Sequence, residues 1–219
     1  MMNPQVEQIY TQLFINYPLL DGCKDDIRNT FFLLQSCYSN KGKLLICGNG
    51  GSAADADHIV GELLKGFREL RPINDKFLTK LKSFYPEDGL DLGRKIQEAL
   101  PAISLTGHPA FSTAFANDIS PDTIFAQQVY AFGDETDILL AISTSGNSRN
   151  IINAIKISRA KGMKSISLTG QTGGEIKKIS DVAICVPSSQ TDRIQELHRP
   201  VYHAICAMLE AEFFSATQK

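Results

Sequence analysis

Five short, mostly apolar segments alternate with helical patterns, and this alternation limits the fold more than any other feature of the sequence. The segments are residues 43–48, 102–106, 138–142, 165–168 and 182–186. Each has about the length of one strand, and continuous apolar runs are typical of strands that are buried on both faces. Strands that alternate with helices favour a parallel sheet. The sequence therefore predicts an α/β fold in which helices cover both faces of a parallel sheet.

Helical patterns fill the intervals between these segments. They are predicted for residues 5–17, 25–38, 53–67, 122–132, 149–160, 174–179 and 192–214. Residues 68–101 differ from the rest, because they are polar, charged and interrupted by prolines. We expect a single domain over residues 1–219, with N-terminal helices in residues 1–40. We expect residues 68–101 to be an insertion with two short helices, which serves as surface decoration, as a lid or as an oligomer contact.

Size, charge and cysteine spacing exclude several classes of function. The chain has 219 residues, 43% hydrophobic residues and a formal net charge of −2, with no basic block that would indicate nucleic-acid binding. No apolar run approaches the ~20 residues that span a bilayer, and the N-terminus lacks a signal pattern, so we expect a cytoplasmic protein without a membrane partner. The five cysteines are scattered without a C-x-x-C motif, which favours buried thiols over disulfides or a metal cluster.

A turn rich in hydroxyl groups follows the segment 138–142 and leads into a helical pattern at Arg149. Backbone N–H groups at a helix N-terminus have no partner within the helix, and the helix dipole there favours negative charge. Hydroxyls add donors around the same anion, and those of this turn belong to Ser143, Thr144, Ser145 and Ser148. One interpretation is a loop that only caps the helix. The other, which the position after a buried strand favours, is a cradle for the phosphate of a small metabolite.

A second turn, Gly48-Asn-Gly-Gly-Ser-Ala53, follows the first apolar segment and also leads into a helix. It matches neither the nucleotide P-loop nor the dinucleotide-binding G-x-G-x-x-G pattern. Glycines let a backbone approach a ligand closely, but they also make tight strand-to-helix turns. Two such turns on one sheet favour a shared pocket.

His58 and Glu62 lie four residues apart in one helical pattern, so the same face of that helix carries both. The pair can bind one metal, can act as a carboxylate base steadied by its neighbour, or can be solvated on the surface. The closing helix carries His198 and His203. His203 is either a buried structural histidine or a member of the site, whereas His198 is expected at the surface or as a capping partner. Pro200 removes a backbone donor there and is expected to bend or restart the helix.

At these motifs the chain resembles the SIS (sugar isomerase) domain proteins and, among them, the bacterial phosphoheptose isomerases. The matching motifs are Cys47-Gly-Asn-Gly-Gly-Ser-Ala-Ala-Asp55 with His58 and Glu62, Ala116-Asn-Asp118, Ile142-Ser-Thr-Ser-Gly-Asn-Ser148, Leu168-Thr-Gly170, and Asp192-Arg-Ile-Gln-Glu-Leu-His198 with His203. They cover most of the chain outside residues 68–101. The serine motif alone is typical of the whole SIS fold, while the pairs His58/Glu62 and Gln195/His203 are typical of the phosphoheptose isomerases.

The resemblance implies a three-layer α-β-α SIS domain with a five-stranded parallel sheet flanked by helices, in a homotetramer with active sites between subunits. It implies that the phosphate is bound by Ser143, Thr144, Ser145 and Ser148. The expected contacts with the rest of the substrate are Asn49, Gly50, Gly51, Ser52, Glu62, Asn117, Asp118 and Gln195. The residues that match the family's zinc ligands are His58, Glu62, Gln195 and His203. Glu62 and His203 also match its acid/base groups.

These groups suit an aldose–ketose isomerisation, in which a proton moves between C1 and C2 through a cis-enediol. The reaction needs a base over one carbon, an acid near the carbonyl oxygen and stabilisation of the enediolate charge. We expect Glu62 to be the base and His203 the acid or proton shuttle, with zinc polarising the carbonyl. The expected reaction converts sedoheptulose 7-phosphate to D-glycero-D-manno-heptose 7-phosphate, in heptose biosynthesis for lipopolysaccharide or other glycoconjugates. The alternatives are a non-catalytic phosphosugar-binding regulator, a replication-initiator-binding protein, or an isomerase for another ketose phosphate.

Two features depart from the family pattern. The insertion at residues 68–101 is longer than the compact members carry, and Pro200 lies between Gln195 and His203. Gln195 and His203 are eight residues apart, which is about 12 Å along a regular helix. Joint ligation of one metal by this pair therefore requires long side chains, a bend or different subunits.

Overall fold

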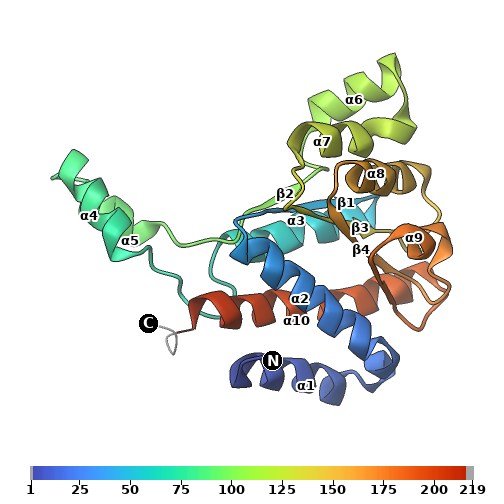
Figure 1. The fold of residues 1–219 in the computed structure, drawn as a ribbon, viewed down its shortest axis with the longest axis horizontal. Helices are drawn as coiled ribbons and strands as arrows, with labels where there is room; N and C mark the ends of the chain where they lie inside the picture. The colour runs from blue at the N-terminus through green and yellow to red at the C-terminus, as the bar shows by residue number, and fades with distance from the viewer. Residues whose placement is uncertain (1, 216–219) are drawn as a thin grey trace.

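A central parallel sheet organises the molecule, which we describe from a computed structural model over residues 2–215 (Figure 1). Within that range the sheet has five strands in the order β2-β1-β3-β4-β5, and all neighbouring pairs are parallel. The strands are β1 (Leu44–Gly48), β2 (Ala102–Ser104), β3 (Ile138–Ile142), β4 (Lys164–Thr169) and β5 (Val182–Cys185). The prediction of a parallel sheet flanked by helices is confirmed.

Side chains along the central strands alternate between two hydrophobic cores, one on each face of the sheet. On β1, Leu44 and Ile46 belong to the larger core, whereas Leu45 and Cys47 belong to the smaller one. Every residue of β1 and of β3 is buried. Because helices cover both faces, neither face of these strands requires polar residues, and this explains the continuous apolar runs in the sequence.

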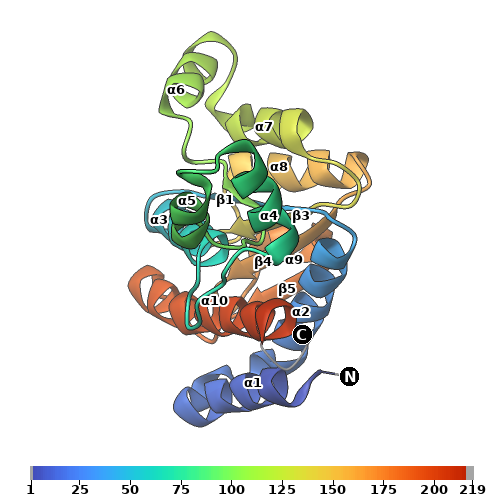
Figure 2. The same ribbon diagram turned by 90° about the vertical axis from the view of Figure 1, so that its left-hand side faces the viewer.

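The larger core is covered by four helices, which are α1 (Pro4–Asn16), α2 (Lys24–Ser39), α3 (Gly51–Leu64) and α10 (Thr191–Phe214). The 3-10 segment η1 (Pro18–Cys23) joins α1 to α2. α10 packs against α1, α2 and α3, and in both Figure 1 and Figure 2 it lies between α1 and the sheet. α3 and α10, the helices of the expected histidines, are therefore neighbours.

The smaller core is covered by α7 (Ile124–Phe132), α8 (Arg149–Ala160) and α9 (Gly174–Ile179). Beyond α7, at the top of Figure 1, lie α6 (Pro109–Asp118) and the 3-10 turn η2 (Pro121–Thr123). α6 packs mainly on η2 and α7 instead of on the sheet. In the described part of the chain, no helix combines the length and the apolar character that crossing a membrane requires.

Residues 68–101 form a helical hairpin whose two helices stand clear of the rest of the protein, at the left of Figure 1 and facing the viewer in Figure 2. Its helices are α4 (Asp75–Phe84) and α5 (Gly89–Lys95), and a β-bridge between Pro72 and Gln97 closes its base. The hairpin begins after the end of α3 and returns at the start of β2. It therefore leaves the sheet at the amino ends of the strands.

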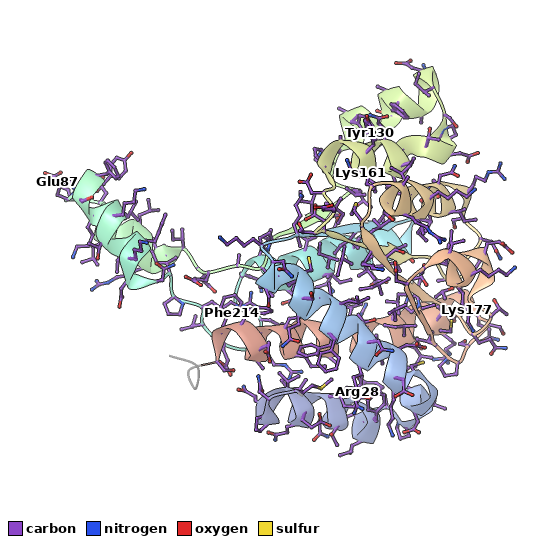
Figure 3. All side chains as sticks on the ribbon, in the orientation of Figure 1. Arg28, Glu87, Tyr130, Lys161, Lys177 and Phe214 are labelled. Atoms are coloured by element: carbon purple, nitrogen blue, oxygen red, sulfur yellow. The ribbon has the colours of Figure 1, made fainter. Side chains whose placement is uncertain are left out.

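A buried ion pair fixes the root of this hairpin to α10. The Arg71 side chain is fully buried, and its Nε donates to Glu210 Oε1 at 2.9 Å. Glu210 also accepts hydrogen bonds from the backbone N–H groups of Phe67 and Arg68, each at 2.7 Å. The Arg71 guanidinium lies 4.6 Å from the ring centroid of Phe214, which Figure 3 labels beside the base of the hairpin.

The same guanidinium also reaches α3. Arg71 Nη1 donates to the carbonyl oxygen of Leu63 at 2.8 Å, and Nη2 donates to that of Glu62 at 3.3 Å. Carbonyl groups at the end of a helix have no partner within the helix, and a cation there also suits the helix dipole. Arg71 thus caps α3 while it neutralises Glu210.

Candidate active site

Two turns lie at the carboxyl edge of the sheet, on either side of the point where the strand order reverses. With β1 and β3 as neighbours in the order β2-β1-β3-β4-β5, the helices that follow these strands pass to opposite faces of the sheet. Ligands of open α/β sheets bind at such a switch point. Asn49 after β1 and Asn150 at the start of α8 join the two turns, because their side-chain amides exchange hydrogen bonds of 3.0 and 2.9 Å. The two turns therefore form one continuous surface.

The turn after β3 leaves its hydroxyls and the start of α8 available to an anion. Ser143 is buried, and its Oγ lies 3.2 Å from Ser148 Oγ. Ser145 Oγ accepts from the backbone N–H of Asn147 at 3.2 Å. Ser148 is the N-cap residue of α8, but its side chain makes no capping hydrogen bond. The N–H of Ile151 is instead bound by Asn150 Oδ1 at 3.0 Å, so the N–H groups of Arg149 and Asn150 are the ones that lack a side-chain cap and can face an anion.

Gly146 allows this turn to pack against the turn that follows β4. Its φ is +67°, a conformation that glycine adopts without strain. A Cβ atom at this position would collide with the carbonyl oxygen of Gly173. The serine turn is thus held by backbone contacts, and its shape depends on glycine at this point.

The turn after β1 starts α3 with a second uncapped N-terminus. Gly50 has a φ of +56° and is the N-cap residue of α3, without a side-chain cap. Ser52 is buried in the first turn. The amide of Gln195 lies against Gly51 so closely that a Cβ on that glycine would be 2.5 Å from Gln195 Nε2. The structure therefore brings Gln195 to the start of α3.

Further along α3, the side chains of His58 and Glu62 form a cluster with His203 of α10. His58 Nε2 lies 3.1 Å from Glu62 Oε1 and 3.5 Å from His203 Nε2. Glu62 Oε2 is buried without a hydrogen-bond partner among the described residues, and the nearest cation is Lys65 Nζ at 3.6 Å. Burial and then the nearby His58 lower the pKa of His203, while the charge of Glu62 opposes this effect. A cavity of about 210 Å³ between α1 and α10 also borders His203.

The second nitrogen of His58 is held by residues that the sequence did not single out as functional. Tyr202 OH lies 3.2 Å from His58 Nδ1 and donates to Asp55 Oδ1 at 3.1 Å. Burial raises the pKa of Asp55, whereas the Tyr202 hydrogen bond and the charge of Arg199 lower it. Tyr202 sits in an otherwise apolar stretch of α10, so the sequence alone offers only its phenolic hydroxyl as a signal.

The donor set has the chemistry that zinc prefers, but the chain does not assemble it fully. Imidazole nitrogens and a carboxylate are typical zinc ligands, and tetrahedral bonds of about 2.0–2.1 Å place neighbouring donors roughly 3.3 Å apart. The two separations at His58 Nε2, 3.1 and 3.5 Å, are close to that value. Within residues 2–215, however, no group of three or more His, Cys, Asp or Glu residues is arranged so that it could hold a metal ion.

Three expected members of the site lie elsewhere in this chain. Gln195 lies at Gly51, seven residues before His58 on α3, which is about 10 Å along the helix. Asn117 and Asp118 are exposed at the end of α6, where Asn117 Nδ2 donates to Asp118 Oδ1 at 3.0 Å. One chain therefore supplies the serine and glycine turns and the His58 cluster.

The expectation for His198 is wrong. Its side chain is fully buried, and neither ring nitrogen makes a hydrogen bond of good geometry within the described residues. Ile194 and Val201, four residues before and three residues after it, are also buried, so His198 lies on the inward stripe of α10. The helix also does not restart at Pro200, because α10 is continuous from Thr191 to Phe214.

Known proteins share this fold and much of this sequence. The family model described as SIS domain matches residues 84–170. A phosphoheptose isomerase from Helicobacter pylori (strain P12) is 39% identical over 194 residues, which are 89% of this chain and 88% of that protein. The solved structure of a phosphoheptose isomerase from Francisella tularensis matches with a TM-score of 0.72 and 33% identity, over 91% of this chain and 92% of the other. The phosphoheptose isomerase structure from Neisseria gonorrhoeae matches with a TM-score of 0.69 and 32% identity, over 94% and 91%.

Proposed function

Because the chain belongs to the phosphoheptose isomerase family of SIS-domain proteins and is therefore an isomerase, we propose that it converts sedoheptulose 7-phosphate to D-glycero-D-manno-heptose 7-phosphate. The choice of substrate rests on one distance, the separation along α3 between the phosphate-type turns and the acid/base cluster. α3 starts beside the phosphate-type turns and presents His58 and Glu62 seven and eleven residues later, roughly 10 to 16 Å along the helix. An extended seven-carbon phosphate reaches the nearer of these two positions, whereas a triose phosphate is too short for either.

The serine turn binds the phosphate in this proposal. Ser143, Thr144, Ser145 and Ser148 offer hydroxyls, and the uncapped start of α8 offers backbone N–H groups. Asn49 and the glycines of the first turn contact the sugar beside it. Binding the remote phosphate fixes the reacting end near Glu62, and binding energy is thereby converted into orientation.

Glu62 and His203 move the protons. The carboxylate of Glu62 takes a proton from C1 of the ketose, while His203 gives a proton to the oxygen on C2, which produces the cis-enediol. Glu62 then returns its proton to C2, and His203 accepts the proton from the oxygen on C1, so the products are an aldehyde at C1 and an unchanged enzyme. The burial of Glu62 and its contact with His58 support this role.

We also propose a zinc ion held by His58, Glu62 and His203 together with Gln195, which another subunit would have to supply because in this chain it lies at Gly51. When bound, it supplies Lewis-acid polarisation of the carbonyl. The donor types and the separations at His58 Nε2 support the assignment. Metal analysis of the purified protein tests it: about one zinc per chain is expected for wild type and a lower content for His58→Ala, whereas wild type that binds no zinc at micromolar concentration contradicts it.

The exposed positions of Asn117 and Asp118 support an assembly in which they complete the site of another copy. We propose a homotetramer with active sites between subunits. Two inactive variants, Glu62→Gln and Asn117→Ala, test the shared site when they are mixed and reassembled. Recovery of activity in the mixture is expected, because some sites then receive both intact residues. A mixture that stays inactive after confirmed subunit exchange refutes the shared site.

The pathway and location that we propose follow from the product. A heptose phosphate of this configuration serves heptose biosynthesis for lipopolysaccharide or another glycoconjugate, and the reaction takes place in the cytoplasm. Deletion of the gene in its host, followed by analysis of surface glycans, tests the pathway. Loss of heptose is expected, and unchanged heptose content contradicts it.

The reaction itself is tested by following aldose phosphate formation from the ketose phosphate. Ser148→Ala is expected to raise KM about 10- to 100-fold, because a hydrogen bond to a charged group contributes about 1.5–3 kcal/mol. Ser83→Ala, an exposed serine on the hairpin, is the matched control and should leave KM unchanged. Absence of turnover with and without zinc refutes the proposal. Binding of the sugar phosphate without turnover indicates a non-catalytic sensor instead, and a panel of other ketose phosphates identifies a different substrate.

A further inference from the structure

We propose that Tyr202 and Asp55 are positioning residues that fix the proton of the neutral His58 ring on Nδ1, so that Nε2 presents a lone pair to the site. The three side chains come from two helices, since Asp55 and His58 lie on α3 and Tyr202 lies on α10. The significance for catalysis rests on the proposed isomerase function, but the hydrogen-bond chain is tested without substrate.

The direction of the two hydrogen bonds that link Asp55, Tyr202 and His58 follows from which atoms can donate a proton and which can only accept one. Tyr202 is 2% exposed, so water does not replace its partners. Its hydroxyl has one proton, and at 3.1 Å it faces a carboxylate of Asp55, which only accepts. The phenolic oxygen is then left to accept at its other contact, 3.2 Å from His58 Nδ1. We therefore infer that Nδ1 is the donor in the neutral ring, and that Nε2, which faces Glu62 Oε1 at 3.1 Å, carries a proton only when the ring is cationic.

The consequence appears on the opposite side of the His58 ring. Nε2 is then unprotonated in the neutral ring, and it faces Glu62 Oε1 at 3.1 Å and His203 Nε2 at 3.5 Å. His58 Nε2 and Glu62 Oε1 then both offer lone pairs at this point, so it attracts a proton, a substrate hydroxyl or a cation. Without the Tyr202 contact, the carboxylate of Glu62 would be the strongest acceptor for the ring, and the proton would move to Nε2. A partner on the far nitrogen commonly sets which nitrogen of an imidazole is free to act.

The nitrogen-15 chemical shifts of the His58 ring in metal-free protein test this directly. In wild type, Nδ1 should carry the proton at every pH at which the ring is neutral. In Tyr202→Phe, which keeps the ring and removes only the hydroxyl, the Nε2–H form should become the major one. Tyr10→Phe is the matched control, because it removes another hydroxyl of a buried tyrosine, one that donates to the Lys24 carbonyl oxygen far from His58. A His58 tautomer that is the same in Tyr202→Phe and wild type overturns the proposal.

Kinetics separate positioning from simple structural support. Tyr202→Phe should lower kcat about 10- to 100-fold, as losses of such supporting hydrogen bonds do, with KM within about threefold of the Tyr10→Phe value. A kcat within twofold of the Tyr10→Phe value overturns the catalytic significance. If wild type isomerises no sugar phosphate, the function proposed above fails, while the nitrogen-15 result still decides the hydrogen-bond chain.

A separate observation, on the hairpin, carries a second inference. No residue of α4 is buried, and its side chains Phe77 and Phe84 are 47% and 67% exposed. They are seven residues apart, so they lie on one face of the helix. The core between the two hairpin helices is thin, and in it Leu78 and Leu81 of α4 pack against Gly93 of α5. An amphipathic helix with large exposed aromatic side chains, held clear of the body, indicates a docking surface (Figures 1 and 2).

We infer that the partner is the hairpin of a second copy, paired with its α4 antiparallel to the first. In that arrangement Phe77 of each chain meets Phe84 of the other. The charges also match, because the α4 helix carries lysines whereas the α4–α5 turn and the start of α5 carry acids. With Phe77 opposite Phe84, antiparallel pairing brings Lys76 at the start of each α4 close to Glu87 in the α4–α5 turn of its partner.

Sedimentation of the full-length protein over a concentration series tests this pairing. The double variant F77S/F84S should dissociate to a smaller assembly than wild type, whereas Leu19→Ser, which changes a still more exposed apolar side chain on η1, should not. Lys76→Glu and Glu87→Lys should each weaken assembly, and the two together should restore it. A wild-type monomer, or an F77S/F84S variant that assembles like wild type, overturns the inference.

Discussion

Removal of the Arg71 guanidinium is predicted to destabilise the protein more than any change to a surface charge. In Arg71→Ala, Glu210 remains buried at 2% exposure with only the N–H groups of Phe67 and Arg68 as partners. The carbonyl oxygens of Leu63 and Glu62 lose their donors as well. Removing one partner of a buried pair costs about 3–5 kcal/mol, because the other charge stays buried without compensation.

The size of this effect is measurable by denaturant unfolding and by thermal unfolding, each at one fixed protein concentration. For a chain of this length, a loss of about 3–5 kcal/mol corresponds to a fall in Tm of roughly 6 to 20 °C. Asp91→Asn is the control, because it breaks the Lys95–Asp91 pair, in which both side chains are 69% exposed. Such an exposed pair contributes about 0–1 kcal/mol.

The comparison between the two variants decides whether burial is the cause. An Arg71→Ala variant that loses less than about 1 kcal/mol, like Asp91→Asn, would refute the reasoning. Glu210→Gln adds a second check, since it keeps the volume and removes the charge. It should lose less stability than Arg71→Ala, because the buried charge that remains is an arginine with two carbonyl partners.

Three further predictions concern the site and its helices. Glu62→Gln should lower kcat about 10²- to 10⁴-fold in the aldose-formation assay, because a general base is lost; an unchanged kcat contradicts the proposed base. Gly146→Ala should destabilise the fold by about 1–3 kcal/mol and raise KM, because φ at this position is +67° and the new Cβ would collide with Gly173. Gly22→Ala is the control, since a Cβ there meets no atom within 4 Å, and equal effects of the two variants would count against the argument. Burial lowers the pKa of His198 to about 4 from 6.5, while the Thr169 backbone opposes this shift. Between pH 4 and 6.5 the unfolded chain binds more protons than the folded one, so the free energy of unfolding should fall by about 3 kcal/mol as the pH drops from 6.5 to 4. His198→Leu should lack this contribution. A His198→Leu variant with the wild-type pH dependence of stability would refute the assignment of this effect to His198.

The sequence predicted the sheet because the relevant signal is local. Buried parallel strands have a continuous apolar character that the chain displays segment by segment, and the hydroxyl-rich turn after 138–142 follows directly in the sequence. That turn lies at the switch point because of the strand order. The alternation of strands and helices in the sequence favours this order but does not determine it. His58 and Glu62 were paired correctly, because helical spacing alone brings them together.

Other features depend on contacts between distant residues and had no local signal. Arg71 and Glu210 resemble surface charges in any helical or loop pattern, and only their mutual contact makes burial favourable. The Tyr202–Asp55 hydrogen bond joins positions 147 residues apart. His198 is a different case, because its spacing from Ile194 and Val201 marked it as inward, and its polarity was wrongly given more weight than that spacing.

The hairpin and the serine and glycine turns leave opposite edges of the sheet. New sequence inserted between the end of α3 and the start of β2 extends away from the strand termini at which Asn49 and Ser148 lie. Such a site of attachment is permissive during evolution, since a lineage can lengthen, shorten or exchange the appendage while catalysis stays under separate selection. For protein engineers, a recognition element grafted at the tip near Glu87 would accordingly change how copies of the chain assemble while it leaves the turns at Asn49 and Ser148 in place (Figure 3).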